Sequence, residues 1–193
     1  MGTGRPQGSD VSDRRVRSLT GKIQEIGFRC RRCGECCSQV SPDSDLVIVS
    51  PPEIRRIMDA TGLGWDEVAE PYPEFIEKDD GTLYTFEWCI KRKDGRCAFL
   101  EGRRCTMYPV RPWICRTYPF MENGEDLLVF PCAGAGETMT GEEAEVLSGE
   151  LVKRRQAEAE EEEKVREIMK NTSIPHGKVV IDGEGMKVLE WVS

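Results

Sequence analysis

Four cysteines within eight residues limit what this chain can fold into more than any other feature. The run reads CRRCGECC, from Cys30 to Cys37. Cys30, Cys33 and Cys36 follow C-x2-C-x2-C, a spacing that lets one loop wrap three thiolates around a metal centre, and its C-x2-C half also occurs in zinc sites. Neighbouring side chains diverge along an extended or turning backbone, so we do not expect Cys36 and Cys37 to bind the same ion. The run predicts metal ligation rather than local disulfides or buried free thiols.

The composition describes an acidic protein with a real core. The chain has 193 residues, nine of them cysteine, and a formal net charge of -8. An acidic balance argues against a role in coating nucleic acid, and no apolar run approaches the ~18 residues of a membrane span. The N-terminus has no apolar signal region, so we expect a reducing cytoplasm, where many cysteines indicate metal or redox chemistry.

Three segments follow from the pattern along the chain. Residues 1–22 have the Gly, Ser, Arg and Asp composition of a flexible arm, which we leave outside the core. Residues 23–139 hold all nine cysteines and form the predicted metal-binding domain. Residues 140–193 predict an extension, in which Thr140 and Glu143 form a capping box for a long acidic helix and the tail forms a hairpin. The predicted class is α+β, a small metal-stapled cysteine-rich domain with this helix and terminal hairpin.

Two local signals predict elements inside the cysteine-rich domain. A strand over Asp45 to Val49 runs into a helix that Ser50 and Glu53 begin as a capping box and Gly62 ends. Asp94-Gly95 predicts the two-residue turn of a hairpin, because both residues tolerate positive backbone angles.

The hairpin register separates two of the later cysteines. With that turn, Cys97 lies opposite Arg92 and Cys89 lies opposite Leu100, so the two thiols face opposite sides. One centre cannot easily use both. We therefore predict that Cys97 binds metal and that Cys89 is a free, partly buried thiol.

The combined cysteine pattern resembles a known family. The order CRRCGECC, then CAFLEGRRCTMYPVRPWICRTYPF, then a late Cys132, is similar to the YkgJ-type cysteine-cluster family, described as a zinc- or iron-chelating domain and often labelled an iron-sulfur oxidoreductase. The resemblance covers roughly residues 28–132, and Cys89 lies outside its pattern. It implies eight thiol ligands: Cys30, Cys33, Cys36, Cys37, Cys97, Cys105, Cys115 and Cys132.

Arginines stand beside these cysteines although the chain is acidic overall. Four thiolates on Zn(II), or on a four-iron cluster of charge 2+, leave a net charge near -2 by formal counting, which nearby guanidinium groups can stabilise. Arg104 also lies next to a cysteine and is a possible donor to sulfur. Adjacency to cysteine, and for Arg111 the resemblance, predict cofactor contacts from Arg29, Arg31, Arg32, Arg111 and Arg116.

Residue type alone does not separate zinc from iron, because all-thiolate sites suit both. We favour an iron-sulfur cluster with a redox or electron-transfer role, which implies an unknown protein or small-molecule redox partner besides the metal. A zinc or iron ion remains the alternative cofactor, and a non-enzymatic zinc module for partner binding remains the alternative function. Some proteins with this cysteine pattern are described as protein lysine methylases, but the chain carries no independent cofactor-binding signature for that activity.

Overall fold

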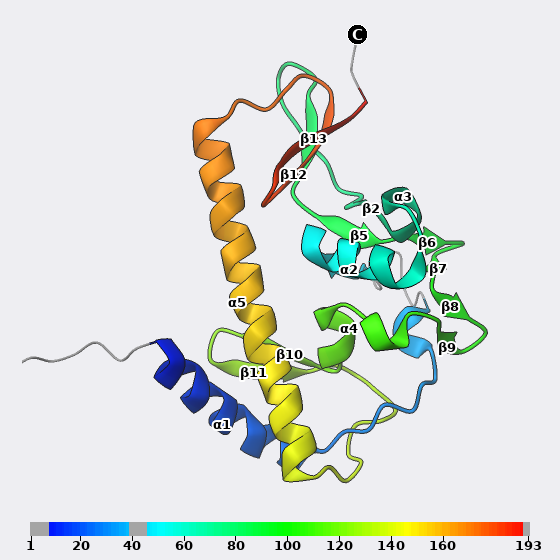
Figure 1. The fold of residues 1–193 in the computed structure, drawn as a ribbon, viewed down its shortest axis with the longest axis vertical. Coiled ribbons are helices and arrows are strands. Elements are labelled where there is room, and N and C mark those ends of the chain that lie inside the picture. The colour runs from blue at the N-terminus through cyan, green and yellow to red at the C-terminus, as the bar shows by residue number, and fades with distance from the viewer. Residues whose placement is uncertain (1–7, 39–45, 191–193) are drawn as a thin grey trace, which may run out of the picture. The chain divides into compact units, whose positions relative to one another are not determined.

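The computed structural model describes residues 8–38 and 46–190 and confirms the α+β class, the long C-terminal helix and the terminal hairpin. The chain divides into two compact units (Figure 1). Unit 1 comprises Met1–Arg31 and Trp113–Ala157, and unit 2 comprises Arg32–Pro112 and Glu158–Ser193. Helix α5, Gly141–Asn171, therefore contributes its first half to unit 1 and its second half to unit 2.

Unit 1 is built mainly from helices. Its further elements are helix α1 (Gly8–Ile26), helix α4 (Trp113–Thr117) and the antiparallel strands β10 (Phe120–Asn123) and β11 (Asp126–Val129). Its apolar core joins α1 to the first half of α5, which lie side by side in Figure 1. The core contains Leu19, Ile23, Phe120, Ala144, Leu147, Leu151 and Val152.

Helix α1 corrects one prediction. We treated residues 1–22 as a flexible arm outside the core, and this is wrong for residues 8–22, while residues 1–7 lie outside the described part. Leu19 and Ile23 are fully buried, and Val16 and Ile26 pack against the same cluster. These four residues recur at helical spacing, a signal that the polar composition of the segment obscured.

Unit 2 contains most of the strands, all of them short. Its elements are η1 (Glu35–Cys37), β1 (Ile48–Val49), α2 (Pro51–Thr61), α3 (Trp65–Val68), β2 (Ala69–Pro71), β3 (Ile76–Glu77), β4 (Leu83–Thr85), β5 (Trp88–Ile90), β6 (Arg92–Lys93), β7 (Arg96–Cys97), β8 (Leu100–Glu101), β9 (Arg104–Cys105), η2 (Tyr108–Val110), β12 (Lys178–Asp182) and β13 (Gly185–Glu190). They form a three-stranded sheet β1-β5-β2, a four-stranded sheet β13-β12-β4-β3 and two separate hairpins, β6-β7 and β8-β9.

The three-stranded sheet carries the core of unit 2. Strand β5 lies in its centre, and its three residues Trp88, Cys89 and Ile90 are all buried. Helix α2 covers this sheet in Figure 1, and Ile54 and Ile57 are both fully buried in the same apolar cluster. The predicted capping box begins α2, and Gly62, with φ of 74°, ends it. Local signals therefore predicted this helix correctly.

The two hairpins confirm one register and correct another. Asp94 and Gly95 have φ of 51° and 75°, as a type I′ turn requires, and Arg92 pairs with Cys97 as predicted. Leu100, however, pairs with Cys105 and not with Cys89. A second turn, with Gly102 at φ 58°, reverses the chain directly after the first hairpin, so the first hairpin is too short to reach Cys89.

No helix within residues 8–38 and 46–190 combines the length and the apolar composition needed to span a membrane.

Candidate metal centre

The predicted ligands divide between the two units. Unit 2 holds five of them, Cys33, Cys36, Cys37, Cys97 and Cys105. Unit 1 holds the other three, Cys30, Cys115 and Cys132. All nine cysteines of the chain, including Cys89, are free thiols.

Four thiols of unit 2 lie close together, and three of them belong to the apolar core or pack against it. The Sγ atoms of Cys36 and Cys37 are 4.0 Å apart in the 3-10 turn η1, which corrects our expectation that these side chains diverge. Cys37 forms a hydrogen bond with Cys97 and is also influenced electrostatically by Cys105. Cys97 is buried in the core, while Cys37 and Cys105 pack against it. We call Cys36, Cys37, Cys97 and Cys105 the thiol group.

Two thiols of this group, Cys36 and Cys37, have raised pKa values. The pKa of Cys36 is raised, mainly by its hydrogen bond to Cys37. A hydrogen bond with Cys36 lowers the pKa of Cys37, but a hydrogen bond with Cys97, burial, and the charges of Cys97 and Cys105 raise it to a net value of about 12. Thiolates this close repel one another, so a bound cation would supply the charge that lets them deprotonate.

The donor set fits a thiophilic metal, although the sulfurs are not arranged around one point. Among the described residues, no three Cys, His, Asp or Glu side chains are placed so that they could hold an ion. A tetrahedral zinc with Zn–S bonds of ~2.3 Å places its sulfurs ~3.8 Å apart, and the Cys36–Cys37 separation is 4.0 Å. Cys36 and Cys37 are therefore already about as close as two ligands of one zinc ion, and binding requires mainly that their side chains rotate.

Two of the predicted arginines stack on one tyrosine beside the thiol group. The guanidinium carbons of Arg32 and Arg111 lie 4.3 and 3.6 Å from the ring centroid of Tyr108. Arg111 also acts on Cys36, since its charge lowers the pKa of that thiol. Arg56 of α2 donates a hydrogen bond to the Arg111 carbonyl oxygen at 3.1 Å and holds this loop in place. Tyr108 thus connects the two arginines beside the thiol group.

Cys33 lies in the loop that joins the thiol group to unit 1. Arg103, in the turn of the β8-β9 hairpin, donates a hydrogen bond from Nε to the Cys33 carbonyl oxygen at 3.1 Å. Gly34 has φ of 77°, and a Cβ there would lie 3.1 Å from the Arg103 carbonyl oxygen. The glycine of CRRCGECC thus permits a close approach between the cysteine loop and the second hairpin.

In unit 1, backbone pairing brings the segments of Cys30 and Cys132 together. Phe28 forms an antiparallel bridge with Ala135, and Arg29 N donates to Gly134 O at 3.0 Å. The Sγ of Cys132 accepts a hydrogen bond of 3.4 Å from Gly134 N. The third thiol of this unit, Cys115, lies on helix α4.

The three predicted arginines of unit 1 form ion pairs. Arg31 Nη2 lies 2.5 Å from Glu137 Oε1 and Arg116 Nη1 lies 2.9 Å from Glu150 Oε2. Arg29 Nη2 is 3.9 Å from Glu143 Oε1, and both of these side chains are exposed. These arginines therefore already have carboxylate partners.

Cys89 has a different environment. It is fully buried in β5, opposite Ile48 on one side and Glu70 on the other. Burial raises the pKa of this thiol to about 12, with a contribution from the charge of Glu87. None of the thiol group is among the residues that shift its pKa, in contrast to Cys37.

A close group of thiols beside a small core, with arginines next to it, is a donor set of the kind found in metal-binding proteins. Comparison with known families agrees, since residues 29–133 match the family CxxCxxCC, described as "Putative zinc- or iron-chelating domain". The match spans more than half of the chain, and the chain belongs to this family.

Among curated proteins the chain is similar to "Uncharacterized protein MJ0661" of Methanocaldococcus jannaschii. The two are 29% identical over 113 residues, which is 56% of this chain and 54% of the relative. The chain thus spans about half the length of this relative. No solved structure matches the chain.

Proposed function

We propose that the chain carries iron on its cysteine thiolates as an iron-sulfur cluster and transfers electrons. The observation that carries the proposal is the thiol group, which gathers four of the eight family cysteines against one edge of the unit 2 core. Thiolates are the ligands that iron-sulfur clusters use, and four of them complete the usual ligand set of one cluster.

The surroundings of the thiol group support a redox role. The reduction potential of such a cluster depends on its net charge, its burial and the hydrogen bonds to its sulfurs. Cys97 is buried, while Cys36 is exposed, so one side of the group faces the core and another faces solvent. Arg111 acts electrostatically on Cys36. A cluster held here would be partly shielded, would have a cationic neighbour and would remain accessible to a partner.

One observation favours a second function. The 4.0 Å between the sulfurs of Cys36 and Cys37 is close to the ~3.8 Å expected for two thiolates on one zinc ion. Zinc has no redox chemistry in proteins, so this alternative makes the chain a structural module that presents a surface to a partner.

Metal analysis and an absorption spectrum of anaerobically purified protein separate the two. An iron-sulfur cluster predicts iron and acid-labile sulfide together with broad charge-transfer absorption near ~400 nm, which bleaches on reduction with dithionite. A colourless protein with stoichiometric zinc, which takes up no cluster on reconstitution with iron and sulfide, would replace the redox proposal with the zinc module.

A further inference from the structure

Positive charge gathers in the two hairpins that carry Cys97 and Cys105. Residues 91–104 contain six Lys and Arg and two Asp and Glu, a net charge of +4. The whole chain has a net charge of -8, so the remainder carries -12. This segment is therefore a local reversal of the charge of the protein.

Part of this charge is neutralised within unit 2. Glu70 accepts a hydrogen bond from Arg92 Nε at 2.9 Å and lies 3.8 Å from Lys91 Nζ. Lys93, Arg96 and Arg104 differ, because all three are exposed and none has an ion pair with any residue in the ranges 8–38 and 46–190. We call these three residues the tip cations.

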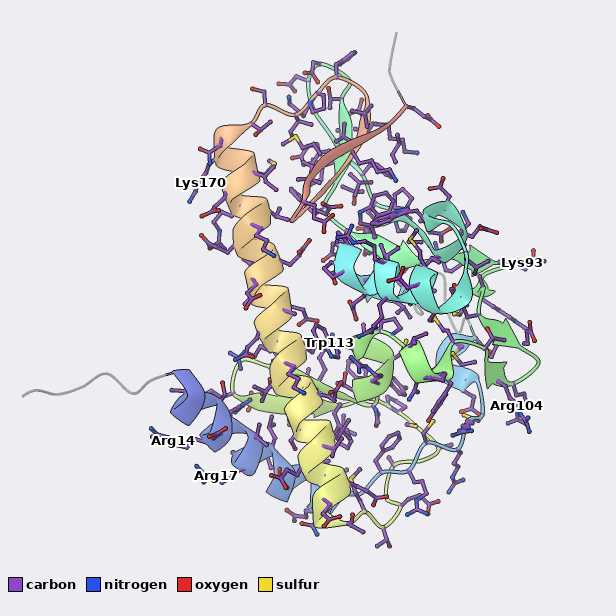
Figure 2. The ribbon with its side chains drawn as sticks, in the orientation of Figure 1. Arg14, Arg17, Lys93, Arg104, Trp113 and Lys170 are labelled. Atoms are coloured by element: carbon purple, nitrogen blue, oxygen red, sulfur yellow. The ribbon has the colours of Figure 1, made fainter. Side chains whose placement is uncertain are left out.

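Two of the tip cations, Arg96 and Arg104, lie on strands that also carry a thiol, and Lys93 lies on β6, which pairs with the strand of Cys97. Arg96 is exposed and its neighbour Cys97 is buried, and Arg104 is exposed while Cys105 packs against the core. This alternation is the ordinary period of a strand. Lys93 and Arg104 project away from the two hairpins in Figure 2. A protein that contacts Arg96 and Arg104 therefore lies over the strands that carry Cys97 and Cys105.

The backbone under the tip cations is well defined. A type I′ turn at Asp94-Gly95 closes the first hairpin, and the hydrogen bond from Arg103 to the Cys33 carbonyl oxygen ties the second hairpin to the cysteine loop. Charges in a fixed arrangement lose less conformational entropy on binding than charges on a free loop. The tip cations thus form a preorganised surface.

We infer that the tip cations are the docking surface for an acidic protein that exchanges electrons with the thiol-bound metal. The inference rests on the proposed function for the electron exchange, but the docking itself depends only on charge. A fixed positive patch attracts and orients an acidic partner, because complementary charges steer the encounter. The partner would then arrive over Cys97 and Cys105.

The test uses a fluorescein-labelled decaglutamate peptide as the acidic probe, with binding followed by fluorescence anisotropy at low ionic strength. The double variant Lys93→Glu and Arg104→Glu should weaken binding at least tenfold. The matched control is Arg17→Glu with Lys170→Glu, which changes the same residue types and the same net charge at exposed sites elsewhere. The control should weaken binding less than threefold, and salt at ~1 M, where the Debye length is ~3 Å, should abolish the difference.

Equal losses in both double variants would show that net charge, and not a surface, controls binding, and unchanged binding in the tip variant would also overturn the inference. So would tighter binding of a single-stranded DNA 10-mer through the same residues, which would indicate nucleic acid instead. A milder double variant, Lys93→Gln with Arg104→Gln, serves as the control in case the charge reversal perturbs folding. It removes two positive charges without adding negative ones, so it should weaken binding by an intermediate amount. The metal content of every sample is measured as well, so that the two proposals are tested separately. Zinc in place of iron would contradict the redox role but would not affect the docking result.

Discussion

Strand β5 and the hairpins β6-β7 and β8-β9 follow one another in the sequence, yet they are held in place by different means. Strand β5 pairs on both sides and all three of its residues are buried. Each hairpin strand is two residues long and pairs on one side only. Isolated two-stranded hairpins are marginally stable in water. Strand β5 is therefore held by pairing on both sides and by apolar packing, whereas the hairpins have less strand pairing, and we expect a thiol-bound metal to stabilise them further.

The largest effect should come from removing a thiol of the hairpins. Structural zinc contributes ~10–16 kcal/mol in small domains, and we expect Cys97→Ala to lose most of the bound metal. Amide hydrogens of residues 92–105 should then exchange at least ~100-fold faster, while those of β5 stay protected. Metal analysis and hydrogen-exchange mass spectrometry measure both. Full metal content in this variant would mean that Cys97 is not a ligand.

The next largest effect should come from the sheet itself. Trp88 is buried, and its Nε1 donates a 2.8 Å hydrogen bond to Asp182 Oδ2. Trp88→Ala should lower the free energy of unfolding by ~3–5 kcal/mol, measured by urea denaturation. Trp88→Phe keeps most of the packing and should cost less. If Trp88→Ala and the wild type unfold at the same urea concentration, packing at β5 is not what holds the sheet.

Cys89→Ala sharpens the comparison between two buried thiols. The variant should keep the full metal content of the wild type and lose only about 1–2 kcal/mol of stability, because a small apolar contact is removed from the core. Cys97→Ala is its natural control. An equal loss of metal in Cys89→Ala and Cys97→Ala would place Cys89 among the ligands. Strand β5 would then depend on the metal as the hairpins do.

The smallest effect should come from the first hairpin turn. Gly95 has φ of 75°, where a side chain costs ~1–2 kcal/mol, so Gly95→Ala should weaken metal affinity by about tenfold. Unchanged metal affinity in Gly95→Ala would show that the turn does not position Cys97.

Gly149 in α5 offers a matched glycine in a helix. A Cβ added there would meet no atom within 4 Å, and Gly149→Ala should raise the free energy of unfolding by ~0.5–1 kcal/mol.

Local features were predictable from the residues because they depend on near neighbours. The capping box of Ser50 and Glu53 is present as expected, and so is that of Thr140 and Glu143, with hydrogen bonds of 2.8 and 3.1 Å between the last two. The turn at Asp94-Gly95 also has the expected register. Helix α3, in contrast, ends at Val68 because Ala69 and Glu70 pair with β5, which local signals do not reveal.

The sequence by itself determined the family, the cysteine spacing, the caps and the turns, since each is written in residues a few positions apart. Only the tertiary structure decided that α1 belongs to a core, because Leu19 and Ile23 gain from burial only when Phe120 and Leu147 are beside them. It also decided which thiols meet. Cys37 and Cys97 are far apart in sequence, and their contact depends on two consecutive turns and on the shared core beneath them, which no local pattern encodes.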